Sequence, residues 1–450
     1  MVVAIRRLQV YDQTKHRWTE MSHKPTHSNS LLTRRQWLGS TLAAANLAQL
    51  VLPPVKVQAI GAAQVASRKK VAAIVTVYRR DSHADVLVGK ILEGWEQNGG
   101  AGPALELLSL YVDQYPADDL SVGLAAKYGF RLCKSIRECL ELNSGTVAVD
   151  GVLSIGEHGD YPVNELGQKL HPRKRFFAEI CDVFERRKKI VPVFNDKHPG
   201  PVWQDASWMM QRAQELGVPW MAGSSLTVGF RDPDVTLPMG EPLKSCLAVG
   251  YSGLDVYGFH TLDFLQALVE RRATKNQGIR SVQAFPLNAI DELIEQRAID
   301  EQLLGQMLIS SGTDLTKLRE NLPAANSEET AVFVVKYSDG LVGNVLMLGN
   351  LARAISAGCT TQAGRTIVTR AEERVEPRYP HFAYLLKAIE RMIHTGKPSY
   401  AVQRTMLAAG ALDRALNSLQ QQSVELQTPE LNFNYACLDY PHAPHVALIE

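Results

Sequence analysis

The sequence predicts an α/β fold in which a doubly wound parallel sheet is followed by an α+β region with a mixed, mainly antiparallel sheet. Over residues 70–223, short apolar runs alternate with helix-length segments, the rhythm of parallel strands joined by right-handed crossovers. After residue 223 the rhythm changes, and two apolar runs are joined by Asp339 and Gly340, a pair typical of tight hairpins. Polar residues directly follow several apolar runs of the first half, as expected where parallel strands end at a binding crevice.

The composition is that of a globular protein. With 450 residues, 45% of them hydrophobic and 21% charged, the chain can bury the cores of two domains. The formal net charge of +1 provides no general attraction to nucleic acid or to an acidic membrane, so neither partner is expected. The expected ligand is a small molecule bound at a local site.

Residues 1–67 are predicted to be an export signal and a linker. Residues 33–38 (TRRQWL) resemble the twin-arginine pattern, and a weakly apolar stretch, 39–52, follows before small residues at a possible cleavage site, 57–59. The apolar stretch is too short to span a bilayer comfortably, so stable membrane insertion is not expected. These features predict export through the twin-arginine route to the periplasm or cell envelope.

The first domain, residues 68–223, should contain buried strands connected by helices. The run 147–156 (VAVDGVLSIG), for example, suits a strand buried on both faces of a parallel sheet. The expected strands are 70–78, 105–112, 130–133, 147–156, 190–194 and 220–223. The expected helices are 84–98, 117–128, 135–142, 174–189 and 203–216. The charges of Arg173, Lys174 and Arg175 are interpreted as the solvated face of a crossover helix.

The second domain, residues 224–425, should be a sheet with helices on one face, followed by a tail, 426–450. The expected strands are 243–251, 281–286, 329–337, 341–348 and 359–369. The expected helices are 260–272, 379–395 and 399–421.

Two polar clusters follow neighbouring apolar runs and should line one crevice, because parallel strands end at the same sheet edge. They are residues 157–161 (EHGDY) and 195–200 (NDKHPG). In the second cluster Lys197 stands between an Asp and a His, whose charges can tune its proton affinity for acid or base chemistry at a hydroxyl. The alternative is a surface lysine. His260 begins a predicted helix and is either a proton shuttle or a core histidine.

Four segments, in order, carry a family resemblance: 108–113 followed by 125–129 (AAKYG), 150–156, 193–199 (VFNDKHP) and 254–263 (LDVYGFHTLD). Together they make residues 70–425 similar to the Gfo/Idh/MocA family, the relatives of glucose-fructose oxidoreductase and inositol dehydrogenase. The resemblance implies a Rossmann-like nucleotide-binding domain and a second domain that binds substrate and whose sheet serves as the interface of a homo-oligomer. It also implies an oxidoreductase that acts on a sugar or polyol hydroxyl with NAD or NADP. Lys197, His260 and Asp255 would be its catalytic residues.

The sequence departs from the family pattern at three points. Where the family has Gly-x-Gly-x-x-Gly, this chain has 77–83 (VYRRDSH), so cofactor phosphates would need charge-assisted bonds from arginines. The family's Glu-Lys-Pro signature becomes Asp-Lys-His-Pro at 196–199, and Asp255 and His260 are five residues apart instead of four. The expected cofactor-binding residues are Tyr78, Arg79, Arg80, Asp113, Gly156, Glu157, His158 and Asp196. Asp113 would accept hydrogen bonds from a ribose, unless it is only a turn carboxylate.

Two other functions remain open from the sequence. His83, His158, Asp160 and His198 all fall at predicted strand ends and offer the nitrogen and oxygen ligands of a divalent metal. A metal there would act as a Lewis acid in a lyase, hydrolase or isomerase. The third possibility is a scaffold that binds a sugar or a partner without chemistry.

Overall fold

The structure, a computed structural model, describes residues 67–272, 277–324 and 328–444, so the predicted export signal lies outside the described residues. Two sheets organise this part of the chain, one of six strands and one of eight. Within the described ranges, no helix combines the length and apolar character needed to cross a membrane.

The six-stranded sheet confirms the predicted doubly wound parallel fold. Its order is β3-β2-β1-β4-β5-β6, and every neighbouring pair is parallel. The strands are β1 (Lys69–Val75), β2 (Leu105–Val112), β3 (Arg131–Cys133), β4 (Gly151–Ile155), β5 (Val193–Asp196) and β6 (Trp220–Gly223). In this order β1 lies between β2 and β4, where the direction of winding reverses. Ligands of such sheets bind at this switch point.

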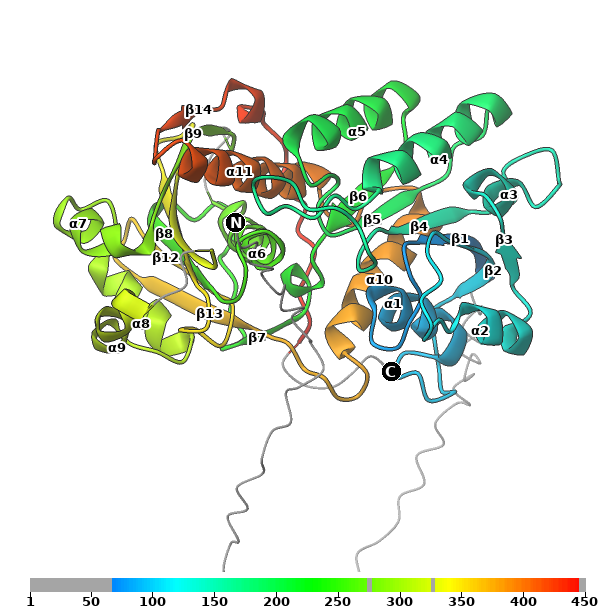
Figure 1. Cartoon of the computed structure of the whole chain (residues 1–450), viewed down its shortest axis with the longest axis horizontal. Coiled ribbons are helices and arrows are strands. Elements are labelled where there is room, and N and C mark those ends of the chain that lie inside the picture. Colours follow the sequence, from blue (N-terminus) through cyan, green and yellow to red (C-terminus); the bar gives the residue numbers. More distant parts are fainter. Residues whose placement is uncertain (1–66, 273–276, 325–327, 445–450) are drawn as a thin grey trace, which may run out of the picture. The chain divides into compact units, whose positions relative to one another are not determined.

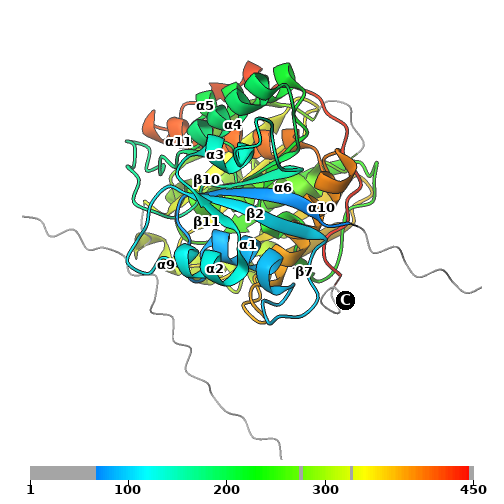
Figure 2. The same ribbon diagram turned by 90° about the vertical axis from the view of Figure 1, so that its right-hand side faces the viewer.

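Helices cover both faces of the six-stranded sheet, with α3, α4 and α5 on one side and α1 and α2 on the other (Figure 2). Their bounds are α1 (His83–Glu93), α2 (Ser121–Tyr128), α3 (Ile136–Glu141), α4 (Arg173–Arg187) and α5 (Trp203–Leu216). A later helix, α10 (Pro380–Thr395), shares the core on the α1 side, where Leu385 and Ile389 pack with Val71 and Val75. A segment far along the chain therefore completes this layer.

The eight-stranded sheet has the order β14-β9-β10-β11-β8-β12-β13-β7 and is antiparallel except for the β11–β8 pair. This confirms the predicted mixed, mainly antiparallel sheet. Its strands are β7 (Phe230–Asp232), β8 (Leu243–Gly250), β9 (Ile279–Phe285), β10 (Thr330–Tyr337), β11 (Val342–Leu348), β12 (Ser356–Thr361), β13 (Thr366–Glu372) and β14 (Leu426–Gln427). The single predicted strand 359–369 is wrong: a turn containing Gly364, whose φ is +81°, divides it into the antiparallel pair β12 and β13.

The expectation that helices cover one face of the second sheet is also wrong, because both faces are covered (Figure 1). Along β10, Ala331 and Phe333 belong to the core shared with α6 and α11, whereas Val332 between them packs with α7, α8 and α9. The helices are α6 (Val256–Val269), α7 (Ile290–Glu295), α8 (Glu301–Ser310), α9 (Leu315–Asn321) and α11 (Val402–Gln420). Short 3-10 turns occur at η1 (Ser225–Thr227), η2 (Leu287–Ala289), η3 (Leu322–Ala324) and η4 (Pro429–Leu431).

Candidate active site

The two predicted polar clusters meet at the carboxyl ends of β4 and β5. Glu157 Oε1 lies 3.2 Å from Lys197 Nζ, and the two side chains are only 8% and 5% exposed. Lys197 and His158 have positive φ angles, 61° and 67°, which non-glycine residues adopt rarely. Backbone strain of this kind tends to occur at functional sites. The sheet edge therefore holds a buried, charged and locally strained group of residues.

Glu157 also binds Arg173, at the start of α4. Arg173 Nη2 donates to Glu157 Oε2 at 2.8 Å, and Arg173 Nε donates to the carbonyl of Gly156 at 2.9 Å. Burial opposes ionisation of Glu157, but Lys197 and Arg173 hold its pKa well below the usual range. The predicted position of Arg173 on a solvated helix face is wrong, because its side chain is 2% exposed.

A histidine–aspartate pair joins the start of α1 to the end of β5. His83 Nδ1, in the first residue of α1, lies 2.6 Å from Asp196 Oδ2, and Asp196 is almost fully buried. The His158 ring approaches the edge of His83, with the ring centroids 5.4 Å apart. Burial lowers the pKa of His158 to about 4, so it is neutral at pH 7. The loops after β1, β4 and β5 therefore converge.

His260 and Asp255 reach the site from α6. His260 Nδ1 lies 2.6 Å from Ser224 Oγ, and burial, reinforced by the nearby charge of Lys197, holds the His260 pKa well below its usual value. Asp255 precedes the first turn of α6, where its Oδ2 accepts the backbone N–H of Lys169 at 3.1 Å. Burial raises the pKa of Asp255 to about 6. These two predicted catalytic residues contact different segments, as their five-residue spacing suggested.

Asp113, the predicted ribose acceptor, follows β2 and is already hydrogen-bonded. Its carboxylate accepts from Tyr111 Oη at 2.7 Å, from Tyr161 Oη at 2.8 Å and from Arg175 Nη2 at 2.5 Å. Burial opposes its ionisation, but these donors lower the Asp113 pKa. Next to it, Gln114 forms two hydrogen bonds with the backbone of Asp160, both 2.8 Å long.

The loop between β1 and α1 contains no glycine, and residues with larger side chains occupy it. Tyr78 is fully buried, and its carbonyl accepts the N–H of Leu120 at 2.8 Å. Carboxylates of Asp81 and Asp85 lie at the start of α1, and both pair with Arg378, at 2.6 and 2.5 Å. In the described part of the chain, the side chains of Arg79 and Arg80 form neither ion pairs nor hydrogen bonds, although the Arg79 backbone is hydrogen-bonded to Ser82 Oγ.

The four residues proposed as metal ligands do not form one cluster, although the rings of His83 and His158 lie 5.4 Å apart. His198 accepts from Arg173 Nη1 at 3.0 Å, and its Nδ1 donates to the carbonyl of Gly200 at 2.5 Å. A guanidinium in that position would repel a metal cation. His83 binds Asp196, and Asp160 is exposed. Across the described ranges, no group of three or more His, Cys, Asp or Glu side chains could hold a metal.

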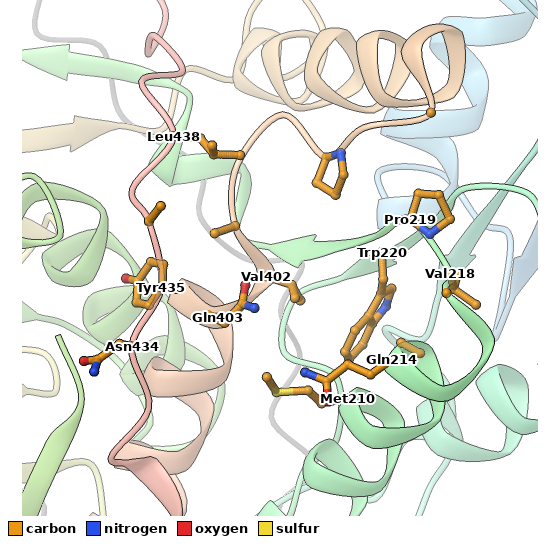
Figure 3. Close-up of a pocket in the computed structure, with 16 residues that line it drawn as sticks. Met210, Gln214, Val218, Pro219, Trp220, Val402, Gln403, Asn434, Tyr435 and Leu438 are labelled. Carbon is orange, nitrogen blue, oxygen red and sulfur yellow. The ribbon is translucent and has the colours of Figure 1, made fainter. Parts of the chain in front are cut away.

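A cavity of about 540 Å³ opens elsewhere, between α5, the start of β6 and residues 434–438 (Figure 3). Trp220 lies on one side and Tyr435 on the other. Pro219 and Trp220 stand at the beginning of β6. The cavity therefore lies at the amino ends of the parallel strands, whereas the polar clusters lie at their carboxyl ends. It plays no part in the arrangement described above.

Comparison with known proteins gives structural matches only. No protein-family model and no curated protein sequence matches the chain. GenD2 from gentamicin A biosynthesis, in complex with NAD, matches with 12% identity and a TM-score of 0.53, over 81% of this chain and 97% of that chain. A probable dehydrogenase from Thermotoga maritima matches with 14% identity and a TM-score of 0.49, over 80% of this chain and 99% of that chain. Myo-inositol dehydrogenase from Lactobacillus casei, in complex with NAD(H) and myo-inositol, matches with 10% identity and a TM-score of 0.49, over 80% of this chain and 96% of that chain.

At these identities the matches inform about the fold alone. The match to GenD2 includes both sheets of the chain, since it covers 81% of the residues. The order of the six-stranded sheet and the mixed second sheet agree with the architecture that the sequence predicted. At the level of the fold, the chain is therefore similar to GenD2, and this agrees with the two-sheet architecture that the resemblance in the sequence implied.

Proposed function

We propose that this protein is an oxidoreductase that acts on a hydroxyl group of a sugar or polyol and uses NAD or NADP. The observation that carries this proposal is the buried pair of Lys197 and Glu157 at the ends of adjacent parallel strands. A lysine in this position can exchange a proton with a substrate hydroxyl. GenD2, which has the same fold, was crystallised with NAD, and this favours a redox reaction over the other possibilities.

The surrounding residues have distinct roles in this proposal. Glu157 and Arg173 fix the position of the Lys197 ammonium group, because the carboxylate binds both cations. His260 is neutral at pH 7 and can accept a proton. Asp255, with a pKa of about 6, can exchange a proton close to neutral pH. Lys197, His260 and Asp255 would relay the hydroxyl proton out of the site.

The donor set at the strand ends suits the chemistry of a dinucleotide. Arg79 and Arg80, unpaired within the described residues, would bind the phosphates. Asp113 would accept hydrogen bonds from a ribose. When bound, the nicotinamide ring supplies a hydride acceptor.

The test compares turnover with cofactor affinity in three variants. Polyols and aldoses are screened with NAD and NADP by the absorbance of the reduced cofactor, and NADH affinity is measured separately by fluorescence. Lys197→Ala should lower turnover about 100- to 10,000-fold and leave NADH affinity nearly unchanged. Asp113→Asn should mainly weaken NADH binding. Lys174→Ala is the control, because Lys174 is 41% exposed on α4 and pairs with Asp205.

Two outcomes would contradict the proposal. Full turnover in Lys197→Ala would remove Lys197 from the chemistry. The absence of binding of NADH and NADPH to the purified protein, at any concentration up to the millimolar range, would remove the cofactor and with it the oxidoreductase.

A further inference from the structure

We infer that residues 157–172, here named the covering loop, close the dinucleotide position over β1 and must move before a cofactor can bind. This inference rests on the proposed function. In the six-stranded sheet β1 lies between β2 and β4. The covering loop follows β4, yet it is hydrogen-bonded to Asp113 and Gln114, which follow β2. The connection therefore passes over the carboxyl end of β1, where dinucleotides bind in folds of this type.

The contact between the covering loop and Gln114 is close and reciprocal. Gln114 Nε2 donates to the carbonyl of Asp160, and the N–H of Asp160 donates to Gln114 Oε1, both at 2.8 Å. His158 and Gly159 have positive φ angles, 67° and 102°, and turn the chain toward β2. A Cβ atom on Gly159 would lie 2.9 Å from Gln114 Oε1 and 2.7 Å from the Tyr161 ring. Only glycine permits this approach, so the closed arrangement depends on the local sequence.

Tyr161 occupies the acceptor that a ribose would need. Asp113 Oδ2 accepts from Tyr161 Oη at 2.8 Å, while Asp113 Oδ1 accepts from Tyr111 and Arg175. Burial and the neighbouring carboxylate raise the pKa of Tyr161, so the phenol remains a donor at every physiological pH. A ribose hydroxyl competes directly with Tyr161, and its binding frees the loop from β2.

The far end of the covering loop contacts the predicted catalytic residues. The N–H of Lys169 donates to Asp255 Oδ2 at 3.1 Å, and Asp255 Oδ1 has no partner within the described residues. Displacement of the loop would therefore remove the hydrogen bond that holds the Asp255 carboxyl group. Cofactor binding and the proton-transfer groups are coupled through this one segment.

The test measures NADH affinity by fluorescence titration of the full-length protein and of two variants. Tyr161→Phe and Gln114→Ala each remove bonds that exist only in the closed arrangement. Each should bind NADH about tenfold more tightly, since a closed population that cannot bind lowers the apparent affinity. The control is Tyr128→Phe, whose hydroxyl donates to the Glu93 carboxylate at 2.7 Å away from the strand ends. Its affinity should equal that of the unchanged protein.

Hydrogen exchange of the unchanged protein provides a second measurement that needs no variant. NADH should accelerate exchange at the Asp160 amide, whose N–H is released from Gln114, although a ligand usually protects the amides near it. Unchanged or weaker NADH binding in both variants, or protection of the Asp160 amide by NADH, overturns the role of the covering loop and leaves the proposed function intact. If neither NADH nor NADPH binds to any of the proteins, both the inference and the proposed cofactor are wrong.

Discussion

The replacement Glu157→Gln tests most directly whether the Glu157 carboxylate stabilises the buried cations Lys197 and Arg173. The carboxylate is 8% exposed and binds Lys197 Nζ at 3.2 Å and Arg173 Nη2 at 2.8 Å. Glutamine keeps the shape and removes the negative charge, so two buried cations remain without their shared partner. At an effective dielectric constant of about 20, each attraction is roughly 5–6 kcal/mol before desolvation is counted.

The net effect should be smaller than this gross attraction. Removing one partner of a buried ion pair typically costs about 3–5 kcal/mol, and we expect a loss in this range for Glu157→Gln. A protein of ordinary stability has a free energy of unfolding of about 5–15 kcal/mol, so the variant would be severely weakened. Urea unfolding at pH 7, followed by fluorescence, measures the difference if the slope against urea is unchanged.

The matched control is Glu179→Gln on α4. Glu179 is 42% exposed and pairs with Arg175 at 3.2 Å, so its loss should cost less than about 0.5 kcal/mol. The stabilisation by Glu157 should depend on pH, because its pKa is depressed in the folded state. Its contribution to the free energy of unfolding is complete above about pH 4.5 and is lost progressively as the pH falls below this value. A cost below about 1 kcal/mol at pH 7, or no decrease of the difference in acid, would refute the reasoning.

Three further predictions concern other parts of the chain. Burial lowers the pKa of His381 to about 3, so as the pH falls this histidine is protonated in the unfolded chain before it is protonated in the folded protein. The free energy of unfolding should therefore fall by roughly 2 kcal/mol between pH 6.5 and 5 because of His381. The His381→Gln variant should not show this loss in urea unfolding. Gly151→Ala should destabilise by about 1–3 kcal/mol in thermal unfolding, because the new Cβ would lie 2.7 Å from Ile393 on α10; a variant as stable as the parent would contradict this packing. Replacing Arg34 and Arg35 by lysine should keep the protein inside the cell in a fractionation assay, whereas normal export would exclude the twin-arginine route.

The sequence predicted the first sheet well because the signal is local. A short apolar run between turn residues identifies a buried strand, and polar residues at its end identify the crevice side of the sheet. The placement of Lys197, Glu157 and His158 on this side of the sheet was predicted in this way. Strand ends shifted by a few residues, since the exact limits depend on pairing with neighbours, as in β1, which ends at Val75 and not at residue 78.

Several of the misses depended on tertiary contacts. Arg173 lies in a charged run that is typical of a solvated helix, and only the fold brings it to Glu157. Two of the three donors to Asp113, Tyr161 and Arg175, lie 48 and 62 residues away in the chain. The helices α7–α9 are each short, so their apolar positions do not repeat often enough to give a clear helical period. No pattern within a single segment could have revealed these contacts.

The two-sided packing of the eight-stranded sheet has a consequence for how copies of this protein associate. A homo-oligomer was expected to use that sheet as its interface, which requires a bare apolar face. Here α7–α9 cover one face and α6 and α11 the other. Subunits that associate would therefore meet through helix surfaces, loops or sheet edges, and the more polar such a surface is, the less apolar area it buries. Self-association should therefore be reversible on dilution and sensitive to salt, which distinguishes it from a permanent sheet-to-sheet dimer.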